Sequence, residues 1–363
     1  MTGRRRFRFP PRRGLVLFLC LGAMLTFCQA VPTATPVGLA KQITLYNWPD
    51  YMPQEVLDAF KQEYGTEVIV QTYDSQEESL RQITSGAVQF DVAVVEYDSL
   101  PELIERNLLA EVDLRNIPNF QNIAADFRDL AVDPGNRHNI PYNWGTTGLI
   151  VRPDLVDAPV TRWADLWDPR HAGKIGLREQ PIEIISIALL SLGYPLNSED
   201  PAQLEAALER LLEIKPSVTF ISSDTQEMLT ALETGRVAIL HGWNGDALIA
   251  RENFPSIQYV LPSEGTMLWG ETFVLSAHSA NRYTSEVFID YILRPQVSAR
   301  IVEALYYPSA NELASQWLPP GILNDPIIYP PHDYLTANRF YTPLSTDGKA
   351  LYEEIWRRFT TAP

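Results

Sequence analysis

Strand-like and helix-like segments alternate from residue 43 onward, and this alternation limits the folds open to the chain. Short apolar runs at 43–47, 68–73 and 90–95 are typical of strands, the last of a buried parallel strand. Between them, 53–64 places apolar residues on one helical face and ends at Gly65. Ser75 and Glu78 suit a capping box that opens a helix to residue 83, and a further helix covers 100–106. This order predicts an α/β fold with a parallel sheet covered by helices.

A second α/β series begins after residue 148. We expect helices at 163–167, 183–192, 201–214, 225–233 and 246–253, and strands at 174–177 and 237–241. Extended passages at 140–151 and 271–276 are suited to carry the chain into a second lobe and back. Two crossings predict two discontinuous α/β domains with a cleft between them. Lobe I would comprise 41–147 plus 272–315, and lobe II 148–271 plus 316–363.

The N-terminus has the pattern of an export signal. Six arginines among the first thirteen residues precede an apolar run at 15–27, which is too short to cross a bilayer. We expect a signal peptide over 1–30, a linker over 31–40 and a periplasmic protein. Cleavage after Ala30 and lipidation of Cys28 both remain open, as do the general and the twin-arginine export routes. Since Cys20 and Cys28 both lie in this segment, we expect no disulfide in the mature protein.

Tryptophans lie beside carboxylates at three places in the chain. Trp48 precedes Asp50, Trp243 precedes Asp246, and Trp269 precedes Glu271, each near the end of an apolar, strand-like run. Ligand loops of α/β proteins emerge at such ends. Aromatic faces attract cations, and carboxylates form charge-assisted hydrogen bonds with ammonium groups. If the three segments meet in space, they form a binding site for an organic cation.

Charge and missing motifs exclude several function classes. The formal net charge is −16, and the chain without its signal arginines carries six more net negative charges, so we expect no nucleic-acid binding. Serine-hydrolase, nucleotide-binding and zinc-site motifs are missing, and we expect no cofactor or metal. The carboxyl pair Glu179 and Glu183 could serve a glycosidase, although acids at the start of a helix more often stabilise that helix. We therefore expect a binding protein rather than an enzyme.

The chain resembles the periplasmic spermidine/putrescine-binding proteins of ABC transporters from about residue 43 to its C-terminus. The resemblance lies in Tyr46-Asn47-Trp48, Ile140-Pro141-Tyr142 to Trp144-Gly145, Trp163-Ala164-Asp165-Leu166-Trp167, Trp243-Asn244-Gly245, Leu293-Arg294-Pro295 and Tyr307-Pro308. It implies the two-lobed periplasmic-binding-protein fold, in which two α/β domains joined by a hinge close on a polyamine. It also implies delivery of the polyamine to the membrane permease and ATPase subunits of an importer, and we expect a monomer.

The same resemblance implies a set of ligand residues. The family's ligand positions fall on Trp48, Asp50, Tyr51, Glu183, Trp243, Trp269, Glu271 and Tyr307. A further ligand loop aligns with residues 96–99 but differs in sequence, offering Glu96 and Asp98. Gln180 stands where the family has a carboxylate, and Thr342 stands near a family glutamine. Glu179 or Asp98 could replace the lost charge, and the preferred polyamine stays open.

The predicted site segments contain seven acids and a single base. The acids are Asp50, Glu96, Asp98, Glu179, Glu183, Asp246 and Glu271, and the base is Arg178. Such a cleft would favour a ligand with several positive charges. Asp246 is expected to cap a helix, and Trp144, Trp163 and Trp167 are expected to pack in the core, whereas Tyr307 suits a turn or a ligand contact equally. A sugar-binding protein of the same architecture and an exported hydrolase are the competing interpretations.

Overall fold

The computed structural model describes residues 38–331, 334 and 343–362. The predicted signal peptide, Cys28, Ala30 and Thr342 lie outside the described residues, as does most of the predicted linker. The first strands and helices follow the predicted order. They are β1 (Gln42–Asn47), α1 (Gln54–Tyr64), β2 (Glu67–Thr72), α2 (Gln76–Ser85), β3 (Val92–Glu96) and α3 (Leu100–Glu105).

The residues predicted to end α1 and to begin α2 do so in the structure. Gly65 ends α1 in the left-handed conformation, with φ of 71°. The Ser75 hydroxyl accepts a hydrogen bond from the backbone N–H of Glu78 and so caps α2. The reciprocal half of the expected capping box is displaced by one residue, because the Glu78 carboxylate accepts from the backbone of Asp74. Strand β1 pairs in parallel with both β2 and β3, as the alternation predicts.

The second series also follows the predicted order, with additional elements. It runs through β4 (Asn139–Val151), β5 (Ile175–Arg178), α4 (Pro181–Ser191), α5 (Pro201–Ile214), β6 (Val218–Ser222), α6 (Thr225–Glu233), β7 (Ile239–Trp243), α7 (Asn244–Asn253), β8 (Gln258–Val260) and β9 (Leu268–Leu275). The C-terminal third adds α8 (Arg282–Ile292), α9 (Pro295–Leu305), α10 (Pro320–Leu323) and α12 (Thr346–Thr361). The expected helix at 163–167 is a 3-10 helix, η5 (Trp163–Trp167).

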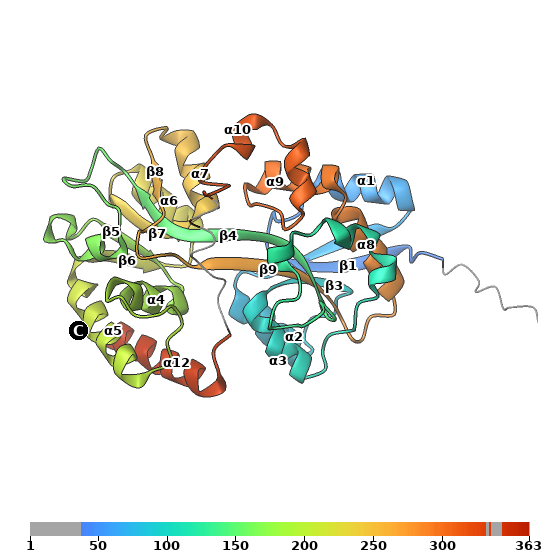
Figure 1. Ribbon diagram of the computed structural model, residues 1–363, viewed down its shortest axis with the longest axis horizontal. Coiled ribbons are helices and arrows are strands. Elements are labelled where there is room, and N and C mark those ends of the chain that lie inside the picture. The colour runs from blue at the N-terminus through green and yellow to red at the C-terminus, as the bar shows by residue number, and fades with distance from the viewer. Residues whose placement is uncertain (1–37, 332–333, 335–342, 363) are drawn as a thin grey trace, which may run out of the picture. The chain divides into compact units, whose positions relative to one another are not determined.

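All nine strands belong to one mixed sheet. Its order is β2-β1-β3-β9-β4-β7-β5-β6, and β8 pairs with β4. The thirteen-residue strand β4 pairs antiparallel with β9 through its N-terminal half and with β7 and β8 through its C-terminal half. Strands β4 and β9 therefore cross from one part of the sheet to the other, and they run side by side through the middle of Figure 1.

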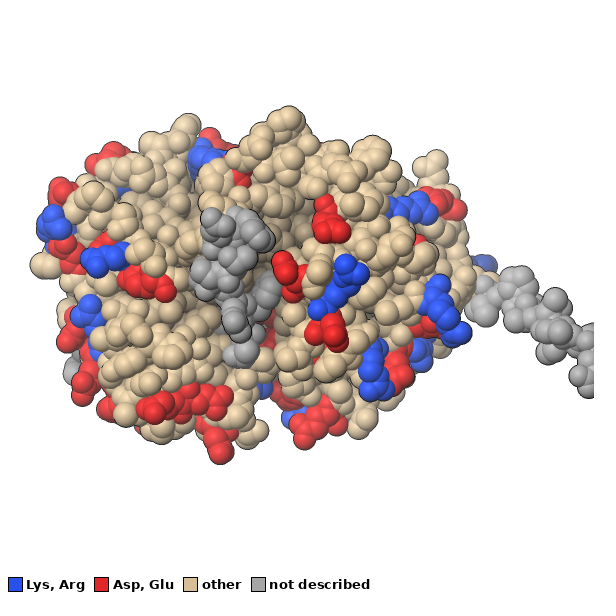
Figure 2. Space-filling model, viewed as in Figure 1, with Lys and Arg blue, Asp and Glu red and all other residues tan. Residues whose placement is uncertain are grey.

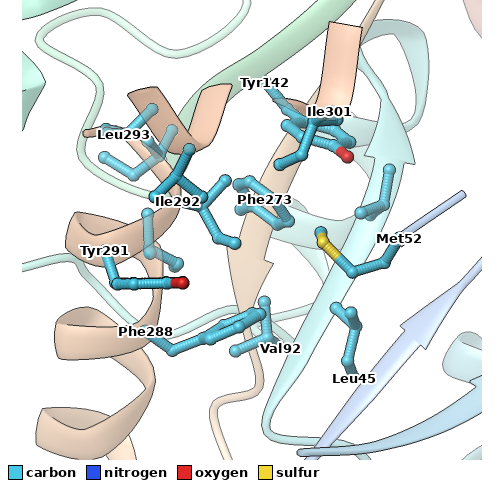
Figure 3. Packing of buried hydrophobic residues seen from close by; sticks show 14 of the residues in the cluster. Leu45, Met52, Val92, Tyr142, Phe273, Phe288, Tyr291, Ile292, Leu293 and Ile301 are labelled. Atoms are coloured by element: carbon cyan, nitrogen blue, oxygen red, sulfur yellow. The ribbon is translucent and has the colours of Figure 1, made fainter. Parts of the chain in front are cut away.

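Separate hydrophobic clusters cover the two ends of this sheet. Around β1, β3 and β9, Leu45, Val92 and Phe273 pack against Phe288 and Ile292 of α8 (Figure 3). Around β5 and β7, the apolar faces of α4, α5 and α12 form another core, and these three helices lie together at the lower left of Figure 1. The lobe boundaries given above stay a prediction. Within the described residues, no helix has the length and apolar character needed to span a membrane.

Charge on the molecular surface does not by itself locate a ligand site. On the face drawn in Figure 2, acidic side chains are interspersed with basic ones. Many of these neighbours form ion pairs within a short stretch of chain, such as Asp168 with Arg170 and Glu354 with Arg357. The informative carboxylates are instead buried where the crossing strands meet the loops after β1 and β3.

Candidate functional site

Glu271 is a buried carboxyl group at the centre of the sheet, and no described residue forms an ion pair with it. It lies in β9, its side chain is 3% exposed, and its direct neighbours across the sheet are Glu96 of β3 and Asn143 of β4. Burial raises the pKa of Glu271 to about 8, against opposing interactions with Trp48, Tyr51 and Asn143. Its Oε2 atom has no hydrogen-bond partner among the described residues.

Several polar atoms around Glu271 are also unpaired. The indole N–H groups of Trp48 and Trp269 and both amide atoms of Asn143 are buried without a partner in the described part of the chain. Buried polar groups are nearly always hydrogen-bonded, and each unpaired one costs about 1–3 kcal/mol. A cluster of unpaired donors and acceptors around a buried carboxyl group is therefore suited to a ligand that would pair with them.

Glu96 extends the negative charge away from Glu271. Directly opposite residues of an antiparallel pair place their β-carbons about 4.5–5.5 Å apart, so the two carboxylates are close neighbours. Burial raises the pKa of Glu96 well above its usual range, and the negative charges of Asp98, Glu271 and Glu183 raise it further. A small cavity beside Glu96 has room for one water-sized group and is lined by Trp48, Tyr73, Gln76, Ser79 and Ser99, among others.

Asp98 differs from Glu96 because its carboxylate already accepts a hydrogen bond from another side chain of the protein. The amide nitrogen of Gln76 donates to Asp98 Oδ1 at 2.5 Å. Burial raises the pKa of Asp98, while this hydrogen bond and the charge of Lys349 lower it. Gln76 opens α2, so the helix N-terminus and the loop after β3 are tied together beside the site.

Four aromatic rings form a continuous row next to Glu271. Ring centroids are 5.7 Å apart for Tyr51 and Tyr307, 4.9 Å for Tyr307 and Trp269, and 6.2 Å for Trp269 and Trp243. Tyr307 is thus brought to the site, which favours the ligand-contact interpretation over a simple turn. The hydroxyl of Tyr142 in β4 donates to the backbone carbonyl of Tyr51 at 3.0 Å and holds the loop after β1 against the row.

Two glycines allow this row to form. The Trp269 ring lies against the backbone of Gly145 in the neighbouring strand β4, where an added β-carbon would overlap the ring. Gly245, at the start of α7, faces Tyr307 in the same way, and a β-carbon there would lie 2.6 Å from the ring. The sequence motifs Trp144-Gly145 and Trp243-Asn244-Gly245 thus contain glycines that admit aromatic side chains.

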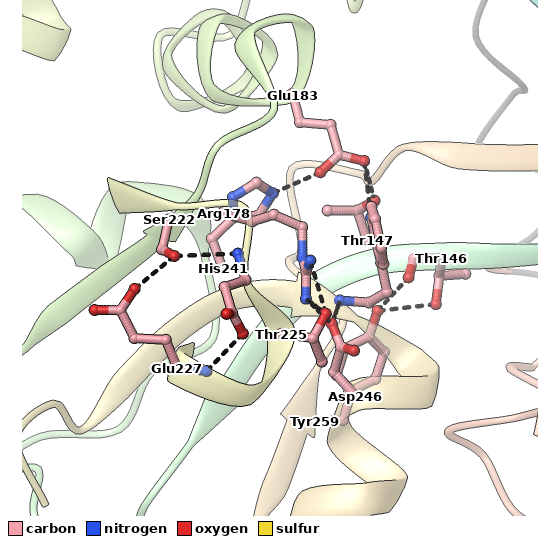
Figure 4. Close-up of polar contacts among 12 residues, drawn as sticks. Thr146, Thr147, Arg178, Glu183, Ser222, Thr225, Glu227, His241, Asp246 and Tyr259 are labelled. Carbon is pink, nitrogen blue, oxygen red and sulfur yellow. Dashed lines mark hydrogen bonds and ion pairs between the residues drawn. The ribbon is translucent and has the colours of Figure 1, made fainter. Parts of the chain in front are cut away.

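Glu183 is buried in a hydrogen-bond network of the protein itself (Figure 4). Its carboxylate accepts from Thr147 Oγ1 at 2.8 Å and from the indole of Trp243 at 3.2 Å, and it contacts His241 Nε2 at 2.8 Å. Burial tends to raise the pKa of Glu183, but the contact with His241 and the other hydrogen bonds lower it below its usual value. Glu183 lies on the first turn of α4, with Gln180 at the N-cap position of that helix.

Arg178 and Asp246 form a buried ion pair under Trp243. Arg178 Nη2 donates to Asp246 Oδ2 at 2.6 Å, and the guanidinium lies 4.0 Å from the centre of the Trp243 ring. Asp246 also accepts from the backbone N–H of Trp243, as expected for a residue that caps α7. Of the seven acids counted in the predicted site segments, Asp246 and Glu183 therefore already have partners within the protein.

The remaining predicted residues have different surroundings. Asp50 and Glu179 are exposed, and Asp50 adopts a left-handed backbone with φ of 57°. Trp144, Trp163 and Trp167 pack in the core or against it, as predicted. Sequence reasoning missed Asn143, Thr147, His241 and Gln76, because only the pairing of distant strands and helices brings them to the site. Within the described residues, no cluster of three metal-ligating side chains is present.

The comparison with known families matches this architecture. Residues 55–330 match the family model for bacterial extracellular solute-binding proteins. The chain belongs to this family. It is 32% identical over 317 residues to the spermidine/putrescine-binding periplasmic protein of Escherichia coli strain K12, covering 86% of this chain and 90% of that protein. It is 30% identical over 358 residues to a putrescine/agmatine-binding protein of Pseudomonas aeruginosa PAO1, covering 93% and 97%.

Solved structures of binding proteins share the fold. The spermidine/putrescine ABC transporter substrate-binding protein of Streptococcus pneumoniae superposes with a TM-score of 0.81 at 29% identity, covering 88% of this chain and 99% of that one. The predicted α/β fold of the periplasmic binding proteins is confirmed. Membership of a solute-binding family likewise confirms a binding protein rather than an enzyme, so Glu179 and Glu183 are not assigned a glycosidase role.

Proposed function

We propose that the protein captures a polyamine outside the cytoplasm and delivers it to an ABC importer. The observation that carries the proposal is Glu271, a buried carboxyl group beside a row of aromatic rings, with an unpaired oxygen and no counter-ion among the described residues. An ammonium group would pair with this carboxylate, and the desolvated rings would attract it further. The relatives named above bind spermidine, putrescine or agmatine by their descriptions, which supports a ligand of this class.

The row formed by Tyr51, Tyr307, Trp269 and Trp243 suits the methylene chain of such a ligand. Each buried CH₂ contributes about 0.8 kcal/mol, so an aromatic wall binds the spacer between two amines. The buried carboxylates then differ in role. Glu271 and Glu96 would pair with the positive charge of the ligand, whereas Glu183 orients Trp243. Asp50, Asp98 and Gln180 stay proposed contacts, since no described interaction ties them to the aromatic row.

A sugar is the competing ligand, because sugar sites also stack on aromatic rings. Sugar hydroxyls pair with a mixture of donors and acceptors and do not neutralise a buried charge. The opposed carboxylates Glu96 and Glu271 lack any compensating cation among the described residues, which disfavours a neutral ligand. We therefore rank a polyamine above a sugar for this site.

Titration calorimetry tests the ligand class directly. Putrescine, spermidine, spermine and a neutral sugar are titrated into the wild-type protein and into Glu271→Gln. We expect the wild type to bind at least one polyamine and not the sugar. Losing one partner of a buried charge pair costs about 2–5 kcal/mol, so Glu271→Gln weakens binding tenfold or more.

The control for this titration is Glu303→Gln on the exposed face of α9, which should bind as the wild type does. Sugar binding without polyamine binding would refute the proposal. An unchanged dissociation constant for Glu271→Gln would remove this residue from the site.

The cellular part of the proposal follows from family membership. An extracellular binding protein of an ABC importer docks on a permease that works with an ATPase, and we propose these subunits as partners of a monomeric protein. Periplasmic release after Ala30 and membrane tethering through Cys28 both agree with this role. Mass spectrometry of the exported protein distinguishes them, because a lipidated N-terminal cysteine has a larger mass and begins two residues earlier than Gln29-Ala30 cleavage would give.

A further inference from the structure

The two ends of the aromatic row differ in the charge that they offer to a ligand. We name Glu271 and Glu96 the carboxylate end, and Glu183, His241, Arg178 and Asp246 the network end. The aromatic row joins the two ends, because the Trp243 indole donates to Glu183, the Trp243 and Trp269 rings are in contact, and Trp269 lies two residues before Glu271 on β9. The partners at each end determine which ligands can span the site, and this inference rests on the proposed function.

At the carboxylate end, neither Glu96 nor Glu271 forms an ion pair with a described residue. The two lie directly opposite each other on antiparallel strands, and Asp98 and Glu183 add negative charge that acts on Glu96. Glu271 Oε2 and the nearby indole N–H of Trp48 are buried without partners in the described ranges. The adjoining cavity, lined by Glu96 and Trp48 among others, has room for one water-sized group, which matches a primary ammonium.

At the network end the protein supplies its own polar partners. Glu183 already has three side-chain partners, Thr147, Trp243 and His241. Asp246 is paired with Arg178, whose guanidinium occupies the face of Trp243. Gln180 is an uncharged amide three residues before Glu183, at the N-cap of the same helix. By the resemblance given above, the family has a carboxylate at this position.

We propose that the site requires one free terminal ammonium at the carboxylate end and accepts an uncharged amide at the network end, so that mono-N-acylated polyamines are ligands. A carboxylate offers about four acceptor positions, and Glu183 has three occupied, which leaves one for an amide N–H. The Gln180 side chain has both a donor and an acceptor, and either can pair with an acyl amide. An acyl group at the opposite end would leave Glu96 and Glu271 unpaired.

Calorimetry with three related ligands tests this polarity. Putrescine, N-acetylputrescine and N,N'-diacetylputrescine are titrated into the full protein under the same conditions. We expect N-acetylputrescine to bind within tenfold of putrescine and the diacetyl compound not to bind. A loss of more than tenfold on the first acetylation overturns the proposal. Failure of putrescine, spermidine and spermine alike to bind would instead overturn the proposed function, so the two failures are distinguishable.

Two substitutions make the test specific to the two ends. Gln180→Glu adds a carboxylate at a half-exposed helix start, where an acid is tolerated. It should raise the preference for putrescine over N-acetylputrescine at least tenfold. Glu96→Gln should weaken both ligands by the same factor, because both place an ammonium there. An unchanged preference in Gln180→Glu, or a selective loss of putrescine in Glu96→Gln, contradicts the assignment of the ends.

Discussion

At the level of single residues, Glu271 shows how a binding site conflicts with the stability of its own fold. A buried carboxyl with a pKa near 8 stays protonated at pH values where the same group in an unfolded chain, with a pKa of about 4.3, is ionised. The folded protein therefore holds a proton that the unfolded chain has lost. Stability of the ligand-free protein falls as pH rises through this window and is constant above it.

Glu271→Gln should separate stability from binding. The amide removes the cost of burying the charge, so the ligand-free variant melts at a higher temperature than wild type at pH 8.5, with little difference at pH 4.5. Binding changes in the opposite direction, since a polyamine needs the ionised carboxylate, and wild-type affinity should increase between pH 6 and 8.5. Thermal melts and calorimetry across this range measure both effects. A melting-temperature difference that does not vary with pH would show that Glu271 is ionised throughout.

Site residues could be predicted from the sequence where the residues that act together are close in the chain. Contacts between residues far apart in the chain could not be predicted. Trp48, Trp243, Trp269 and Glu271 were found because their own motifs contain aromatic and acidic side chains. The pairing of Arg178 with Asp246 spans 68 positions, and that of Glu183 with His241 spans 58. Asp246 and Glu183 consequently have partners within the protein that the sequence motifs do not contain, and only the folded chain reveals them.

At the level of elements, the crossing strand β4 sets the shape of the site. Its residues contact the loop after β1 through Tyr142, the ring of Trp269 through Gly145 and the carboxylate of Glu183 through Thr147. The sequence marks this passage as extended but gives no sign that β9 lies between β3 and β4. That pairing joins residues more than 120 positions apart, and no local propensity encodes it.

Gly145→Ala tests the close approach of β4 to Trp269. The added methyl would overlap the indole ring, so the ring would have to shift, and its contact with Tyr307 would change with it. We expect polyamine affinity to fall tenfold or more while the secondary structure, measured by circular dichroism, stays intact. Gly321→Ala is the matched control, since nothing lies near the added atom there. Wild-type affinity in Gly145→Ala would mean that the position of Trp269 is unimportant for binding.

Helices were predicted well where caps and apolar faces coincide. Boundaries of α5 and α6 match their predicted ranges, because Asp200 and Asp224 cap them and Pro201 opens the first. Strand β6 was not predicted, and its burial pattern is only partial, as a strand at the end of the sheet allows. The 3-10 form of η5 was missed because five residues are too few to distinguish it from an α-helix.

At the level of the whole molecule, the ligand would join contacts from both predicted lobes. Trp48 and Tyr51 pack against the core around β1, β3 and β9, whereas Glu183 lies on α4, whose apolar residues form the other core. Among the described strands, the antiparallel pairing of β4 with β9 joins these parts of the sheet. Opposed carboxylates repel each other across a site without ligand, and a bound polycation removes this repulsion.

Closure on the ligand is therefore the expected global response. A polyamine favours the form in which both sets of contacts are made, so saturating putrescine or spermidine should reduce the radius of gyration in solution scattering. Tryptophan fluorescence should change at the same ligand concentration, because Trp48, Trp243 and Trp269 border the site. The melting temperature should rise, since the ligand binds the native state alone. A neutral sugar is the control and should cause none of these changes. Confirmed binding with an unchanged radius of gyration would leave the ligand class intact but would rule out closure about β4 and β9.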